Sequence, residues 1–154
     1  MDQSRRKFIC QSLCAMATGA AATVMPVIAG AENTANEVPA YPYPYKELDP
    51  AVAEKIAYEG YFENGCCYGV AKGLLAELRE KVGYPYTVIP AEMFANGKEG
   101  YTCGTLCGAL GGAVGVIGLC CGPDDSRELV KKLFAWYTST NLPIYQPEEA
   151  APVQ

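Results

Sequence analysis

Residues 103–121 decide the fold, and they read Cys-Gly-Thr-Leu-Cys-Gly-Ala-Leu-Gly-Gly-Ala-Val-Gly-Val-Ile-Gly-Leu-Cys-Cys. The 18 residues from Gly104 to Cys121 carry no charge, and six of them are glycine. Such a run is typical of a helix buried among other helices, or of a membrane span near the lower length limit of about 17 residues. We expect burial, because glycine contributes little transfer energy and its helix cost of about 1 kcal/mol must be offset by close packing. No stable membrane span is therefore expected.

Helix signals on both sides of this run predict an all-α fold. Asp49-Pro50 supplies an N-cap and a first-turn proline, and Asn64-Gly65 ends the helix that they open. The helices that we expect span about 50–62, 66–82, 90–95, 103–121 and 124–140. The fold class is thus an all-α compact bundle of about four main helices with a central Gly-rich buried helix. Core candidates on the last helix are Leu129, Leu133, Phe134, Trp136 and Tyr137.

The first 31 residues have the pattern of a cleaved export signal. A basic start at Arg5-Arg6-Lys7 precedes an almost uncharged stretch that ends Ala29-Gly30-Ala31. The paired arginines resemble the twin-arginine (Tat) class of signal peptide. That resemblance implies export of an already folded protein, often one loaded with a cofactor, and a periplasmic or otherwise exported location.

Three further segments follow the signal. Residues 32–48 form a Pro/Tyr-rich arm or linker, in which proline and tyrosine alternate between Pro39 and Tyr45. We favour a solvated linker over an arm whose tyrosines lie along a groove of this domain or of a second subunit. Residues 49–142 form the helical Cys-rich redox domain, and residues 143–154 form an acidic tail that we expect to be loosely held.

Charge and composition exclude several classes of function. Removal of residues 1–31 takes Arg5, Arg6, Lys7 and Asp2 from 12 basic and 17 acidic residues, which leaves nine and 16, a net charge of −7. Such a surface repels phosphate backbones, so we expect no nucleic acid partner. The chain has no histidine, which excludes Ser-His and Cys-His nucleophile activation, His-ligated zinc and a His haem ligand. Covalent haem c is not expected from this chain, because C-x-x-C-H is absent.

Sulfur must therefore carry the chemistry, and six cysteines remain once Cys10 and Cys14 leave with the signal. Cys103 and Cys107 are four residues apart and share one face of the expected helix, while Cys66-Cys67 come from another helix and can face them. Cys121 would lie about 21 Å from Cys107 at the helical rise per residue. We assign Cys120-Cys121 a secondary or structural role, or a subunit contact.

Three interpretations of this group remain open. Four thiolates suit an iron-sulfur cluster or a zinc ion, whereas a thiol pair near a helix N-terminus suits exchange with disulfides. Alternatively, buried cysteines pack as small hydrophobic residues. The candidate catalytic (redox), cofactor-binding and metal-binding residues are Cys66, Cys67, Cys103 and Cys107.

Two segments resemble a known family. Cys107-Gly-Ala-Leu-Gly-Gly matches a C-G-A-x-x-G signature, and Asn64-Gly-Cys-Cys-Tyr-Gly-Val provides an upstream cysteine. Together they resemble the C_GCAxxG_C_C family of redox-active proteins. The stretch 65–119 is also similar to split-Soret cytochrome c, whose haem c needs the C-x-x-C-H and histidine ligands that this chain lacks. The resemblance carries over only Cys66 or Cys67, and Cys107, while Cys103 is added from helical spacing.

The sequence thus predicts an exported redox protein that uses a cysteine thiol or a Cys-ligated metal or cluster for electron transfer or thiol exchange. The alternative is a non-enzymatic accessory or dimerising subunit of an exported oxidoreductase, with structural cysteines. The expected partners are a second copy of the chain or an exported oxidoreductase. The cofactor is left open, with an iron-sulfur cluster as one candidate.

Overall fold

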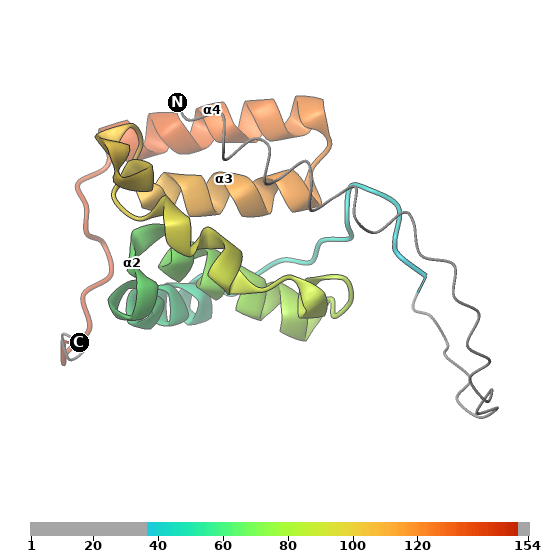
Figure 1. The fold of residues 1–154 in the computed structure, drawn as a ribbon, viewed down its shortest axis with the longest axis horizontal. Coiled ribbons are helices and arrows are strands. Elements are labelled where there is room, and N and C mark those ends of the chain that lie inside the picture. The colour runs from blue at the N-terminus through green and yellow to red at the C-terminus, as the bar shows by residue number, and fades with distance from the viewer. Residues whose placement is uncertain (1–36, 151–154) are drawn as a thin grey trace, which may run out of the picture. The chain divides into compact units, whose positions relative to one another are not determined.

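The computed structural model describes residues 37–150, and within them every regular element is a helix or a helical turn (Figure 1). The long helices are α2 (Pro50–Lys81), α3 (Gly108–Cys120) and α4 (Pro123–Ser139). Short helical turns cover Tyr86–Val88, Ala91–Gly97 and Gly100–Gly104. The predicted all-α class is confirmed. The predicted signal peptide, residues 1–31, lies outside the described residues, so its cleavage and the boundaries of the four segments stay predictions.

Helix α2 is two helices joined at a sharp break, as the Asn64-Gly65 signal predicted. The side chain of Asp49 caps its start by accepting a hydrogen bond of 2.9 Å from the Ala51 N–H. Asn64 leaves helical geometry, and Gly65 has φ +82°, a conformation that glycine adopts without the strain of a Cβ atom. The chain then folds back, so that Gly73 packs directly against Ala53 and Ala57. With the break counted, residues 37–150 contain the four main helices expected.

The core lies between the second half of α2, the helical turns at Tyr86–Val88 and Ala91–Gly97, and α3. Its buried members are Tyr68, Ala71, Leu75, Leu78, Tyr86, Ala91 and Val116. No residue of α3 is exposed, and four of them are fully buried, which confirms the prediction of a buried glycine-rich helix. Within residues 37–150, no helix has both the length and the apolar character needed to cross a membrane.

The predicted start of the glycine-rich helix at Cys103 is wrong, because α3 begins at Gly108. The preceding segment takes a left-handed course, in which Glu99, Tyr101 and Thr102 have φ values between +56° and +61°. Right-handed helical geometry cannot continue through such residues. The absence of charge from Gly104 onward indicated burial, but it did not mark where the helix begins.

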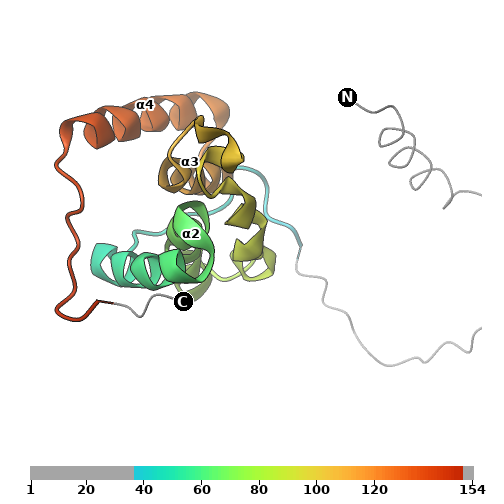
Figure 2. The same ribbon diagram turned by 60° about the vertical axis from the view of Figure 1, so that its left-hand side comes forward.

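Helix α4 covers α3 from the outside, and α3 lies between α2 and α4 (Figure 2). None of its residues is fully buried. Leu129 and Trp136, expected in the core, are 41% and 47% exposed. That expectation is wrong for these two residues, because no described element packs on the outer side of α4.

The Pro/Tyr-rich segment is bound to the domain as an arm. The Tyr41 hydroxyl donates to the carbonyl oxygens of Gly118 at 3.0 Å and Cys121 at 2.8 Å. The Tyr43 N–H donates to the Leu119 carbonyl oxygen at 2.9 Å. The preferred interpretation, a solvated linker, is therefore wrong for this part of the arm. The last carbonyl groups of a helix lack partners within it, and here the arm supplies donors for those of α3.

The acidic tail also has one contact with the domain. The rings of Tyr145 and Tyr58 meet edge to face, with their centroids 5.5 Å apart. The described residues of the tail are otherwise mostly exposed. The tail thus makes an aromatic contact with α2, and the expectation that its acidic end is loosely held stays a prediction.

Candidate functional site

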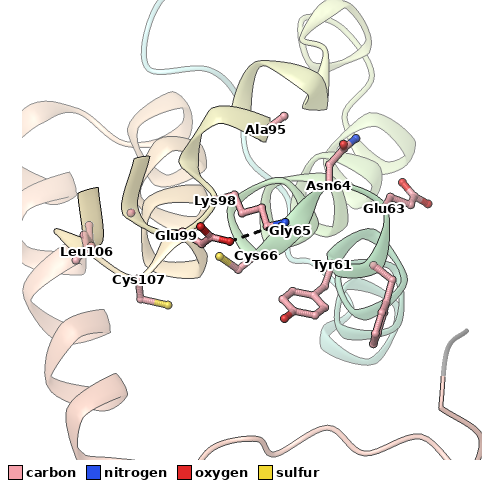
Figure 3. Close-up of a pocket in the computed structure, with 14 residues that line it drawn as sticks. Tyr61, Glu63, Asn64, Gly65, Cys66, Ala95, Lys98, Glu99, Leu106 and Cys107 are labelled. Carbon is pink, nitrogen blue, oxygen red and sulfur yellow. Dashed lines mark ion pairs between the residues drawn. The ribbon is translucent and has the colours of Figure 1, made fainter. Parts of the chain in front are cut away.

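The most developed pocket lies where the break in α2 meets the N-terminus of α3. It has a volume of about 1120 Å³, and Cys66 and Cys107 both line it. Figure 3 shows the sulfur atoms of these two residues pointing toward each other. Both side chains are half-buried and neither is in a disulfide. The fold thus brings together two thiols that are 41 positions apart in the sequence.

Cys66 owes its position to the break in α2. It follows Gly65, whose φ of +82° turns the chain at that point. Its Sγ atom lies against Gly108, so close that an ideal Cβ on that glycine would stand 2.6 Å from the sulfur. Real Cβ atoms do not come that near a sulfur atom, so Gly108 must lack a side chain for Cys66 to sit beside Cys107.

Cys107 is the N-cap residue of α3, where backbone N–H groups point toward its side chain. Burial opposes ionisation of the thiol, but the Tyr137 hydroxyl and the N–H groups of Ala109 and Leu110 outweigh it and lower the pKa of Cys107. The side chain makes no regular capping hydrogen bond, so we ascribe the backbone contribution to the partial positive charge of the helix start. Cys107 is the thiol of this pocket that favours the thiolate form.

Cys67 does not line the pocket. It is 1% exposed and packs against Gly97 and Gly111 behind the pocket. Burial raises the pKa of its thiol, and the neighbouring Cys66 and Cys107 add to that rise. The structure therefore surrounds Cys67 with packing contacts that keep it a neutral thiol.

Cys103 lies apart from the other three. It is exposed in the left-handed segment before α3 and does not line the pocket. The expected sharing of one helix face by Cys103 and Cys107 is wrong, because the helix begins only at Gly108. Among residues 37–150, no three or more Cys, Asp or Glu side chains are grouped closely enough to hold a metal ion. The four predicted site cysteines are thus not assembled into one ligand set.

Cys120 and Cys121 lie at the far end of α3, about 20 Å from Cys107 along 13 residues of helix. The Cys120 Sγ atom is 3.3 Å from the Tyr86 hydroxyl, and burial is the main cause of its raised pKa. The carbonyl of Cys121 accepts the hydrogen bond from Tyr41. The predicted separation from Cys107 is thus confirmed, while the secondary or structural role of these two cysteines stays a prediction.

Tyr137 is the residue of the site that sequence reasoning missed. The periodicity of the last helix assigned it to the core, yet its hydroxyl interacts with Cys107, which raises the pKa of Tyr137 while lowering that of the thiol. The two residues meet because of how α4 lies along α3. The spacing of residues within either helix does not predict that relative position.

Comparisons with known proteins identify the family of this chain. A family model described as "Putative redox-active protein (C_GCAxxG_C_C)" matches residues 66–145. Split-Soret cytochrome c of Desulfovibrio desulfuricans (strain ATCC 27774) is 39% identical over 111 residues, which cover 70% of this chain and 39% of the relative.

A solved structure, described as a novel iron centre in the split-Soret cytochrome c from the same strain, has a TM-score of 0.65 and 36% identity. The match covers 68% of this chain and 45% of that one. The chain thus spans less than half the length of the relatives it matches.

Proposed function

The chain belongs to the C_GCAxxG_C_C family of redox-active proteins, and on this premise we propose that it is an exported thiol redox protein in which Cys66 and Cys107 exchange with disulfides. Cys107 would be the attacking thiol, and Cys66 would be the thiol that resolves the mixed disulfide. The observation that carries the proposal is that Cys66 and Cys107 line one accessible pocket, where the Tyr137 hydroxyl and the start of α3 lower the pKa of Cys107.

The exchange has two steps. The Cys107 thiolate attacks one sulfur of a substrate disulfide, which forms a mixed disulfide and releases the other substrate sulfur as a thiolate. Cys66, as its thiolate, then attacks the Cys107 sulfur, forms the Cys66–Cys107 disulfide and releases the second substrate thiolate. Two electrons pass from the protein pair to the substrate, and the two protons of the protein thiols end on the two product thiols. A dithiol reductant would return the pair to its starting state.

The chain's own residues assist each step. Tyr137 and the start of α3 stabilise the attacking thiolate of Cys107. They also make Cys107 the better leaving group when the dithiol reductant attacks the Cys66 sulfur of the Cys66–Cys107 disulfide, because a thiol of lowered pKa leaves faster. The two half-buried sulfur atoms line the same pocket, so the fold supplies both thiols of the exchange at one site.

The solved relative suggests an iron centre as the cofactor. Whether this chain suits such a centre depends on the metal-ligating side chains that it contains. A cluster is held by four thiolates, with histidine as a substitute in some centres. The chain has no histidine, and residues 37–150 contain no group of three metal-ligating side chains. These residues do not fit such a centre, so the proposed exchange contains no step through iron.

The experiment that tests this function is a redox titration of the full chain in mixtures of a dithiol and its disulfide, followed by alkylation and peptide mapping. We expect a disulfide between Cys66 and Cys107 that Cys66→Ser or Cys107→Ser abolishes. Cys103→Ser is the matched control, because Cys103 is exposed outside the pocket. Cys66 and Cys107 that stay free under the most oxidising mixture would refute the proposal.

Export by the Tat pathway is proposed from residues 4–31 alone. Fractionation of a Tat-competent host should place the processed chain outside the cytoplasm. Replacement of both Arg5 and Arg6 by lysine should leave the unprocessed chain inside, while Lys7→Arg should still be exported. Equal export of the wild type and the double lysine variant would rule out the twin-arginine route.

A second candidate function, a dimerising accessory subunit, is favoured by an apolar groove of about 400 Å³ between α2 and α4. Its lining includes Leu74, Leu110, Leu133 and Leu142, with Trp136 at the edge and 47% exposed. A second copy of the chain would bury these side chains. Sedimentation of the wild type and of Trp136→Ser tests this candidate, which requires a dimer that the substitution dissociates.

A further inference from the structure

We infer that the disulfide exchanged at this pocket belongs to a polypeptide, and that an anionic small disulfide such as oxidised glutathione is a poor substrate. The inference deepens the proposed thiol exchange and rests on it. Two independent features of the lining support it, namely the charges around the sulfur atoms and the apolar side chains at the two ends.

The charges of the lining disfavour an anionic ligand. Its charged side chains are Glu63, Lys98 and Glu99, which are two carboxylates and one ammonium group. The Lys98 ammonium is 4.0 Å from the Glu99 carboxylate, and Glu63 already binds Lys72 at 2.6 Å. Recognition of a ligand with several carboxylates needs several basic donors, and Lys98, at ion-pair distance from Glu99, is the single basic side chain of this lining. The carboxylates of glutathione would thus find no cluster of basic groups, on a chain whose net charge of −5 repels anions.

The apolar side chains of the lining suit a polypeptide. Tyr61 is 53% exposed and Leu106 is 38% exposed. Figure 3 shows Leu106 beyond Cys107 on one side and Tyr61 beyond Cys66 on the other, so the two sulfur atoms lie between them. A cystine residue that reached the sulfurs would place its neighbours in the substrate chain against these side chains. Exposed aromatic and aliphatic side chains beside a reactive group are typical of protein recognition surfaces.

The size of the pocket agrees with this substrate class. Its volume of about 1120 Å³ exceeds the range of about 300 to 1,000 Å³ that is usual for small-molecule sites. A small disulfide would therefore leave much of the lining uncovered. A polypeptide segment that continues on both sides of its cystine would cover the lining from Leu106 to Tyr61.

The test measures the rate at which the reduced full chain reacts with three probes. These are an uncharged small disulfide (hydroxyethyl disulfide), oxidised glutathione, and an uncharged peptide that carries a disulfide between apolar neighbours. We expect the peptide to react at least about tenfold faster than oxidised glutathione. Added salt should raise the glutathione rate, because it screens the repulsion, and should leave the other two unchanged.

Leu106→Ser and Leu129→Ser form a matched pair of variants, because the two leucines are 38% and 41% exposed and only Leu106 lines the pocket. Leu106→Ser should lower the peptide rate several-fold and spare the small uncharged disulfide, and Leu129→Ser should change neither. Glu99→Gln should raise only the glutathione rate. A glutathione rate equal to or above the peptide rate, or equal peptide rates for the two serine variants, would overturn the inference.

The outcomes separate this inference from the proposed function. If the wild type reacts with the small uncharged disulfide and Cys107→Ser does not, the exchange function holds and the comparison of peptide with glutathione decides the substrate class. If the wild type reacts with none of the three probes, both proposals fail.

Discussion

The sulfur atom of Cys66 lies 2.6 Å from the point where a Cβ atom on Gly108 would stand, so α2 and α3 meet here without a side chain between them. The same point is even closer to the carbonyl oxygen of Gly97. One glycine therefore sets both the packing of two helices and the position of a pocket thiol.

Gly108→Ala should destabilise the protein by about 1 to 3 kcal/mol, because a methyl group forced into a close-packed contact displaces its neighbours. Gly118→Ala is the matched control on the same helix, since a Cβ atom there would meet nothing within 4 Å. Its higher helix propensity should leave stability unchanged or raise it by up to about 1 kcal/mol. Urea denaturation of both variants measures the difference, and equal stabilities would contradict the close contact at Gly108.

Tyr137→Phe should raise the pKa of Cys107. The hydroxyl that it removes is, after the opposing effect of burial, the main interaction on the thiol and stabilises the thiolate. The pH profile of iodoacetamide labelling at Cys107 should therefore shift to higher pH and toward the ordinary thiol value of about 8.5. Tyr61→Phe provides the control, because Tyr61 lines the pocket without acting on Cys107. Superimposable profiles would remove Tyr137 from the site.

Cys66 and Cys67 should differ widely in labelling rate although they are adjacent. Cys67 is 1% exposed, and burial raises its pKa, so it reacts only when the structure opens locally. Cys66 is half-buried and lines the pocket. Mass spectrometry of native protein after a short labelling pulse should find Cys66 modified at least about tenfold more than Cys67. In denaturant the two rates should become similar, and a similar ratio in the native state would contradict the placement of Cys67.

Tyr86→Phe should loosen the arm. The Tyr86 hydroxyl donates to the Pro44 carbonyl oxygen at 2.9 Å and contacts Cys120, and the Tyr86 side chain is fully buried. Loss of this buried partner should cost about 1 to 3 kcal/mol. Limited proteolysis should then cut faster near Pro44, whereas Tyr45→Phe, at an exposed ring, should be cut at the wild-type rate. An unchanged cleavage rate in Tyr86→Phe would show that this bond does not hold the arm.

Glu77 should make stability depend on pH under acidic conditions. Its buried carboxylate accepts from the Asp49 N–H at 2.7 Å and from Lys81 at 2.9 Å, and these two interactions lower its pKa. A depressed pKa means that the stabilisation is complete above the carboxyl value of the unfolded chain, about 4.3, and is lost as the pH falls through the folded value. Denaturation midpoints between about pH 6 and 2 should fall less steeply in Glu77→Gln than in the wild type, and parallel curves would exclude this role.

The helices could be predicted from the sequence because their signals are local. Asp49-Pro50 and Asn64-Gly65 mark ends that the structure reproduces within a few residues. The start of α3 at Gly108 could not be predicted this way, because the left-handed course of residues 99–104 leaves no signal beyond its glycines.

The site was predicted only in part. Cys66-Cys67 were expected to face Cys103 and Cys107, and of these four cysteines Cys66 and Cys107 line the pocket. Whether Cys66 or Cys67 lines the pocket depends on how the helix after the break is rotated. Whether Tyr137 reaches Cys107 depends on how α4 lies on α3. Both are tertiary relationships between elements distant in sequence, so spacing within one element does not determine them.

The break at Asn64-Gly65 has a consequence for how this chain tolerates changes of length. Successive residues of a helix are rotated by about 100°, so the angle at which the chain leaves the break decides which cysteine faces the pocket. Insertion of one residue directly after Gly65 would turn Cys66 into the direction that Cys67 now takes and so remove it from the pocket, although both cysteines would still be present. The positive φ of Gly65 thus sets the direction of the side chains that follow it. It places the Cys66 sulfur in the pocket and leaves the Cys67 sulfur buried.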